Sequence, residues 1–72
     1  MREKRVYFKE LEPDMTVHDY EVLRILDGQD VPGWTWGAAM GICCEWLCKK
    51  GYAKPGYDIT VNGVHFLNRT HQ

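Results

Sequence analysis

Two stretches in the second half of the chain decide its fold: Leu47-Cys48-Lys49-Lys50-Gly51-Tyr52 and Ile59-Thr60-Val61-Asn62-Gly63-Val64-His65-Phe66-Leu67. Gly51 predicts the end of a helix, because glycine adopts the left-handed C-cap conformation without steric cost. Between the two stretches, residues 52–54 and 57–59 form two expected strands around a turn at Pro55-Gly56. The sequence therefore predicts a helix followed by a short hairpin.

The second stretch has two interpretations. Asn62-Gly63 is a signal for a type I′ hairpin, which would pair Val61 with Val64 and Ile59 with Phe66. Alternatively, Thr60 caps a closing helix that runs through Leu67. We favour the helix, because the resemblance of the whole chain to a known family, described below, implies it. Periodicity alone favours the hairpin, so both alternatives stay open.

A first helix is expected after Thr16. Thr16 and Asp19 have the spacing of a capping box, and Gly28 marks the end of the helix. Apolar side chains recur at helical spacing on one face: Val17, Tyr20, Val22, Leu23, Ile25 and Leu26. The polar residues are expected to face away: Asp19, Glu21, Arg24 and Asp27.

After a loop over residues 29–33, a second helix is expected from about Trp34 to Trp36 through Lys50. Its buried face is expected to carry Trp36, Ala39, Met40, Cys43, Trp46 and Leu47, with Ile42 at the border. Its opposite face carries Gly37, Ala38, Gly41, Glu45 and Lys49. A glycine inside a helix costs about 1 kcal/mol relative to alanine. Gly37 and Gly41 therefore indicate either close approach of another molecule or an irregular first turn.

Residues 1–13 are expected to form an N-terminal strand or arm of a single domain that covers residues 1–72. Arg5-Val6-Tyr7-Phe8-Lys9 is aromatic and β-branched in its centre, which is typical of a short edge strand. The Val6-Tyr7-Phe8 strand could join the hairpin sheet of its own chain or of a neighbour. Glu12-Pro13-Asp14 ends this segment.

From about Thr16 to Leu67 the chain resembles the winged helix-turn-helix superfamily, including the multiple-antibiotic-resistance repressor type and other small bacterial or phage regulators. The resemblance rests on a helix ending Leu-x-x-x-Gly-Tyr, a short strand pair, and Ile-Thr-x-x-Gly-x-x-x-Leu. It implies a small α+β domain with two or three helices and a β-hairpin wing, to which an N-terminal strand could be added. The chain departs from the superfamily between Leu26 and Gly51, where a middle helix must be a single turn near residues 31–34 or be missing.

The resemblance implies double-stranded DNA as the partner and transcriptional regulation as the function, with the second helix in the major groove. The base-facing candidates are Thr35, Ala38, Gly41 and Glu45. The phosphate candidates are Lys49, Lys50, Lys54 and Arg69, joined by the N-terminal arm with Arg2, Lys4 and Arg5. Base edges are normally read by Arg, Lys, Asn or Gln, which this face does not offer.

The competing hypothesis is a protein-interaction module on the same scaffold, which could be a homodimer. Two tryptophans separated by one residue cannot both be fully buried, so we expect Trp34 to contact a partner, beside Gly37 and Gly41. A symmetric dimer that buries the outer face of the second helix would exclude that helix from the major groove of DNA.

The composition argues against several other classes. The formal net charge is −1, although clustered cations can coexist with a balanced charge. Neither a signal-peptide core nor a membrane-spanning run is present, and three cysteines do not form a secreted disulfide framework, so we expect a cytoplasmic protein with reduced thiols.

The cysteines and histidines do not form a recognisable chemical motif. Cys44 and Cys48 lie four residues apart without a second pair, and further zinc ligands would have to come from the histidines: His18, His65 and His71. A Cys-His nucleophilic pair would need one thiol activated by His18 or His65. No local signature supports either chemistry, so we expect no enzyme activity, no metal and no cofactor.

Overall fold

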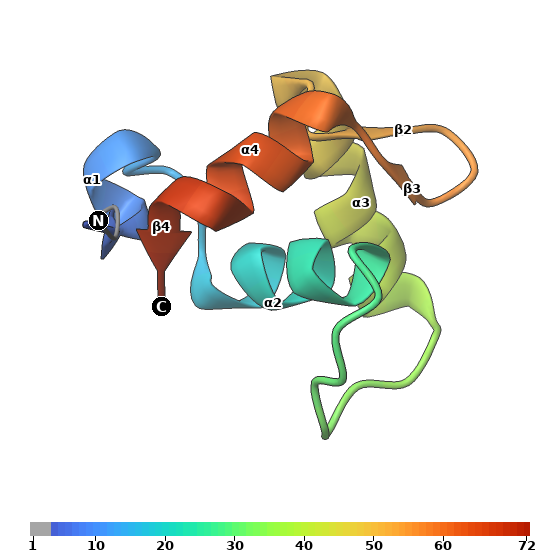
Figure 1. Ribbon diagram of the computed structural model, residues 1–72. Coiled ribbons are helices and arrows are strands. Elements are labelled where there is room, and N and C mark those ends of the chain that lie inside the picture. Colours follow the sequence, from blue (N-terminus) through green and yellow to red (C-terminus); the bar gives the residue numbers. More distant parts are fainter. Residues whose placement is uncertain (1–3) are drawn as a thin grey trace.

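The structure, a computed structural model, describes residues 4–72 and is a small α+β domain (Figure 1). Its elements, in chain order, are β1 (Val6–Tyr7), α1 (Phe8–Leu11), α2 (Val17–Leu26), α3 (Ala38–Lys50), β2 (Ala53–Lys54), β3 (Asp58–Ile59), α4 (Val61–Arg69) and β4 (Thr70–His71). The predicted α+β class, the β2–β3 hairpin and the closing helix are therefore confirmed.

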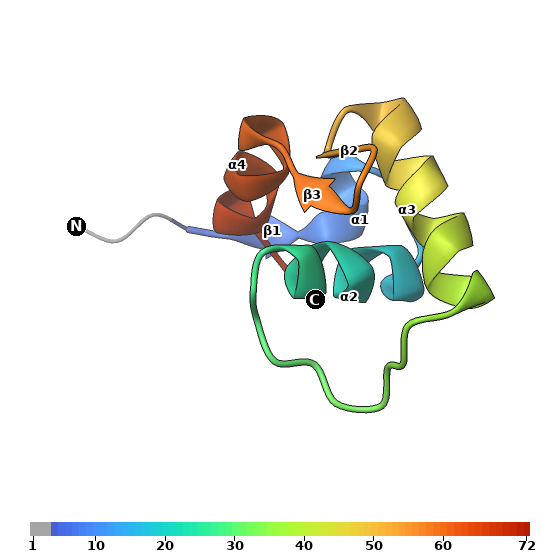
Figure 2. The same cartoon turned by 90° about the vertical axis from the view of Figure 1, so that its right-hand side faces the viewer.

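Helix α2 packs against both α3 and α4, and the β2–β3 hairpin projects from the end of the molecule where α3 and α4 meet (Figures 1 and 2). The hairpin is antiparallel, with Ala53 opposite Ile59. One possibility for the N-terminal strand was the hairpin sheet of its own chain, and the structure does not show this pairing. β1 instead pairs in parallel with β4, with Val6 opposite Thr70, so the two ends of the described chain lie together.

The predicted strand also ends earlier than expected, because Phe8 begins the four-residue helix α1. Phe8 is completely buried and stacks on Tyr20, with 4.6 Å between the ring centroids. Turning the chain at Phe8 places this ring in the core. The largest fully buried side chains are Phe8, Met15, Leu23, Met40, Leu47, Val22 and Thr70.

The N-terminus of α2 has the predicted capping box. The backbone N–H of Asp19 donates to Thr16 Oγ1 at 3.1 Å, and the backbone N–H of Thr16 donates to Asp19 Oδ2 at 3.1 Å. Asp19 is consequently buried, and the expectation that it faces away from the core is wrong. Gly28 follows the helix with φ of 90°, a conformation that favours glycine.

Helix α4 decides between the two interpretations of residues 60–67. The backbone N–H of Gly63 donates to Thr60 Oγ1 at 3.1 Å, so Thr60 caps a helix and the hairpin alternative is wrong. A Cβ on Gly63 would collide with the backbone carbonyl oxygen of Tyr52 and lie 2.7 Å from Ile59 Cγ1. Gly63 is therefore a close-contact glycine beneath the hairpin rather than a turn glycine.

Helix α3 ends as predicted but begins later. Gly51 has φ of 85° and caps its C-terminus, whereas the first helical residue is Ala38 and not Trp34, Thr35 or Trp36. Gly33, with φ of 93°, turns the chain before the tryptophans, and Gly37 is extended. Residues 34–37 therefore lie outside the helix.

The shorter α3 changes which side chains are buried. Trp36 was expected in the core but is 61% exposed. Ala39 is also exposed, while Cys44 is buried beside the expected core residues Met40, Cys43 and Leu47. The 100° spacing correctly placed Met40, Cys43 and Leu47 in the core, but it failed for Trp36 before the helix begins, for Ala39 in its first turn and for Cys44.

Candidate interaction groove between α3 and the hairpin

The outer face of α3 and the β2–β3 hairpin enclose a groove with a volume of about 420 Å³. We call it the α3–hairpin groove, and its lining residues are Gly41, Cys44, Glu45, Cys48, Lys49, Lys54, Pro55, Gly56 and Tyr57. The nearest atom to a Cβ built on Gly41 is Tyr57 Oη at 3.7 Å, so the absence of a side chain at Gly41 leaves part of this space open.

Large apolar side chains stand exposed around the groove. Trp36 stacks on Tyr57 with 5.4 Å between the ring centroids, and Tyr57 is 51% exposed. Ile42, next to Gly41 on α3, is 69% exposed. Tyr57 has φ of 64°, unusual for a residue with a side chain, and follows Gly56, whose φ is also positive. This tight turn places the Tyr57 ring beside Trp36.

The residues predicted to contact DNA do not form one continuous surface. Gly41, Glu45, Lys49 and Lys54 line the α3–hairpin groove. Ala38 begins α3, and Thr35 lies in the preceding loop and not on the helix. The other two phosphate candidates lie elsewhere, and Arg2 of the predicted arm lies outside the described residues.

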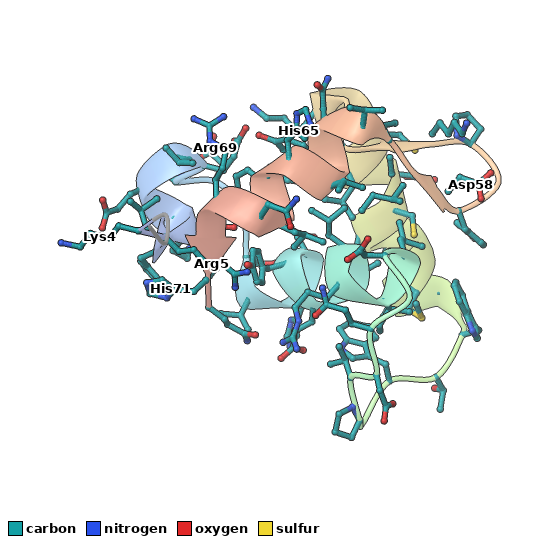
Figure 3. All side chains as sticks on the ribbon, in the orientation of Figure 1. Lys4, Arg5, Asp58, His65, Arg69 and His71 are labelled. Carbon is teal, nitrogen blue, oxygen red and sulfur yellow. The ribbon has the colours of Figure 1, made fainter. Side chains whose placement is uncertain are left out.

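Lys50 and Arg69 each have local surroundings that separate them from the groove. Lys50 Nζ lies 3.4 Å from Glu12 Oε1 and 5.7 Å from the centroid of the Trp46 ring. Arg69, at the end of α4, lines a different cavity together with Lys4, near α1 (Figure 3). An α3 docked in a DNA groove would therefore be flanked most directly by Lys49 and Lys54.

Of the two tryptophans, the exposed one is Trp36 and not Trp34. Trp34 is half-buried, and its indole N–H donates to Glu21 Oε1 at 2.8 Å. Its ring also meets the edge of His18, with 5.7 Å between the ring centroids. Gly37, the other predicted partner contact outside the groove, is exposed, and no atom lies within 4 Å of the point that a Cβ there would occupy.

Three exposed residues in or near this groove were not predicted to belong to a site: Tyr57, Trp36 and Ile42. An aromatic residue directly after a Pro-Gly turn is a signal that could have identified Tyr57, because turn residues are usually exposed. No comparable local signal exists for Trp36, because its exposure depends on where α3 begins.

The cysteine environments are opposite to those of an activated nucleophile. Cys43 and His18 line one cavity, but burial raises the pKa of the Cys43 thiol to about 12, and the nearby Asp19 carboxylate contributes to this increase. Burial also raises the pKa of the Cys44 thiol. A reactive cysteine needs a lowered pKa, because the thiolate is the nucleophile.

Within residues 4–72, no three His, Cys, Asp or Glu side chains are placed so that they could together hold a metal ion. In the same part of the chain, no helix combines the length and apolar character needed to cross a membrane.

Comparison with known proteins gives no relative. No family model matches the chain, and searches of curated proteins and of solved structures return no match. Any function must therefore be inferred from the geometry of the molecule itself.

Proposed function

We propose that this protein is a non-enzymatic protein-interaction domain that pairs with a second copy of itself through the α3–hairpin groove. The observation that carries the proposal is the groove that Gly41 leaves open, with exposed apolar side chains in and near it. Tyr57 lines the groove, Trp36 stacks on Tyr57, and Ile42 follows Gly41 in α3. Exposed aromatic and aliphatic side chains that surround a concave apolar site are typical of interaction surfaces.

The same surface is complementary to itself, as a twofold interface requires. Ile42 is exposed directly beside Gly41, so an Ile42 side chain from one copy can fill the groove of the other. Glu45 and the lysines Lys49 and Lys54 line the same groove, so each copy offers both a carboxylate and ammonium groups at the edge of the contact. Two copies can thus bury their apolar side chains against each other and pair their carboxylates with the ammonium groups of the other copy.

Sedimentation velocity over a micromolar to millimolar concentration series tests the pairing. We expect a concentration-dependent dimer for the unchanged chain and a monomer for Ile42→Lys, because the lysine would bring an unpaired charge into the apolar contact. Val61→Lys is the matched control, since Val61 is also an exposed aliphatic side chain, at 70%, but belongs to α4 and not to the outer face of α3. A chain that stays monomeric throughout, or a Val61→Lys variant that dissociates equally, contradicts the proposal.

DNA binding is the second candidate function. Lys49 in α3 and Lys54 in β2 favour it, because both line the same groove beside the solvent-facing side of α3. The two candidates exclude each other on this surface, because a dimer through α3 keeps α3 out of the major groove. Against DNA binding stand the absence of base-reading side chains at Ala38, Gly41 and Glu45 and the formal net charge of −1.

Fluorescence anisotropy with a mixed-sequence duplex at low and moderate salt measures this second candidate. DNA binding would weaken steeply as the salt concentration rises. Replacing Lys49 and Lys54 by glutamine would reduce the slope of the logarithm of the binding constant against the logarithm of the salt concentration by about 2 in magnitude. Undetectable binding at low salt rules out a stand-alone DNA-binding role.

A further inference from the structure

We propose that a second cavity, at the opposite end of the molecule from the hairpin, binds a phosphate group. The cavity has a volume of about 230 Å³ and lies between α2, α4 and β4, with Arg5 just before β1 at its edge. We call it the β4 pocket. Its cationic side chains are Arg5 and Arg24, and the imidazole of His71 also lines it. This inference is independent of the pairing proposed for the α3–hairpin groove.

The β4 pocket exists because the ends of the described chain are paired. Arg5 directly precedes β1, and His71 belongs to β4, so the parallel ladder of Val6 with Thr70 brings them together. Figure 3 shows Arg5 and His71 at this end, far from Asp58 in the hairpin. Arg24 comes from the last turn of α2. Three elements that are distant in the sequence thus each contribute a side chain that can carry positive charge.

The guanidinium of Arg24 is held in place by neutral amides. Its Nε–H donates to Gln29 Oε1 at 2.9 Å, and its Nη1–H donates to Gln72 Oε1 at 3.1 Å. The amide nitrogens of these glutamines donate in turn to Asp27 Oδ2 and Glu21 Oε2, both at 3.1 Å. The carboxylates therefore orient the amides and do not contact the guanidinium themselves.

In the described part of the chain, no carboxylate contacts the arginines of the β4 pocket directly, and Glu21 interacts with Arg24 only through space. Within residues 4–72, no aspartate or glutamate lines it, and neither Arg5 nor Arg24 forms an ion pair. The pocket also includes the amide side chain of Asn68 as a neutral hydrogen-bonding group. An incoming oxyanion can supply the missing negative charge and accept from several donors at once.

Phosphate fits this arrangement better than a larger ligand. Arginine presents a planar fork of N–H donors that matches phosphate oxygens, and hydrogen bonds between ionised groups are the strong ones. A volume of about 230 Å³ is below the range of pockets for drug-sized molecules, so the pocket suits a single small group. Arg24, already oriented by its two amides, loses little freedom when the anion binds.

Titration with inorganic phosphate at constant ionic strength, followed by ¹H–¹⁵N NMR, tests the proposal. We expect saturable shifts at the backbone amides of residues 70–72 and at the Nε–H of Arg24. Arg5→Gln and Arg24→Gln are each expected to weaken the affinity about tenfold, which corresponds to the loss of one charged hydrogen bond. Lys9→Gln is the control, because it removes a cation that lines neither the β4 pocket nor the α3–hairpin groove, and it is expected to leave the affinity unchanged.

The two arginine variants separate binding from folding. Arg24 also links α2 to Gln72, so its replacement can loosen the fold, whereas Arg5 is exposed and makes no such link. Absence of saturable shifts in the unchanged chain overturns the proposal, as does an equal loss of affinity in Lys9→Gln.

A competition experiment, in which a DNA duplex is added to the phosphate-bound protein, identifies the source of the phosphate group. If a DNA duplex displaces bound phosphate from the β4 pocket, the site takes a nucleic-acid backbone phosphate. If phosphate stays bound, the ligand is free phosphate or a phosphate monoester. Both results support a phosphate site, and they assign it to different sources.

Discussion

At the scale of single residues, Gly63 shows how one position can be misread from its neighbours. Asn62-Gly63 has the composition of a hairpin turn, but in the structure the glycine lies inside α4 beneath the carbonyl of Tyr52. The requirement for glycine comes from close packing and not from a left-handed backbone. The sequence could show that a glycine is needed here, but its reason depends on a contact with a residue in another element.

We expect Gly63→Ala to lower the free energy of unfolding by about 2 to 3 kcal/mol, because the added methyl group meets backbone that cannot move aside cheaply. The matched variant is Gly41→Ala, also inside a helix, where the new methyl group lies in ordinary contact with Tyr57 Oη. This variant is expected to raise stability by up to about 1 kcal/mol, because alanine is the better helix former. Urea unfolding measures both, and equal effects would contradict the close-contact role of Gly63.

At the scale of elements, the helix ends that local chemistry determines could be predicted, and those that distant contacts determine could not. Thr16 and Gly51 cap helices as their sequence context indicates, and Gly28 follows the end of α2. Thr60 also caps a helix, although the neighbouring Asn62-Gly63 is a hairpin signal. The start of α3 could not be predicted, because Trp34 is held outside the helix by a hydrogen bond to Glu21 in α2. The groove was therefore only partly predictable: Gly41, Glu45 and Lys49 were placed on the correct face, and Trp36 was not.

The two threonine caps are expected to differ in strength. Thr16→Ala removes a cap and is expected to cost about 1 kcal/mol of stability. Thr60→Ala is expected to cost about 2 kcal/mol, because the Thr60 hydroxyl also donates to the Gly51 carbonyl at 2.7 Å and so joins α4 to the end of α3. Thermal or urea unfolding of both variants measures the difference. Thr60→Ser should restore most of the loss, and equal costs for the two alanine variants would contradict the second role of Thr60.

At the scale of the whole molecule, polar contacts join parts of the chain that no local sequence pattern connects. Glu21 in α2 accepts from Trp34 in the long loop and from Gln72 at the end of the chain. In the core, the hydroxyl groups of Tyr20 and Thr70 lie 3.0 Å apart. Periodicity and capping describe segments one at a time, so neither these contacts nor the parallel pairing of β1 with β4 could be predicted.

Acid is expected to weaken this network. Hydrogen bonds from Trp34 and then Gln72 lower the pKa of Glu21 below its ordinary value of 4.5. The unfolded chain therefore binds this proton more readily than the folded chain. The stabilisation is fully present above pH 4.5 and is lost as the pH falls through the lowered pKa of the folded state.

The comparison of Trp34→Phe with Trp36→Phe measures this effect. Both variants lose an indole N–H, but only Trp34 donates to Glu21. At low protein concentration, we expect the urea unfolding midpoint of Trp34→Phe to fall less steeply with decreasing pH than that of the unchanged chain. The midpoint of Trp36→Phe is expected to depend on pH as steeply as that of the unchanged chain. Identical slopes in all three proteins would show that Glu21 does not carry the acid sensitivity.

The parallel pairing of β1 with β4 also has a mechanical consequence. If the described chain is pulled by its two ends, β1 and β4 are drawn in opposite directions along their length, so their hydrogen bonds are loaded together and do not open one after another. The first resistance to a stretching force would therefore come from a ladder of only two residues per strand, Val6 with Thr70 and Tyr7 with His71. Once β1 and β4 separate, the force acts next on α1 and α4. The packed contact between α2 and α3 bears the force last.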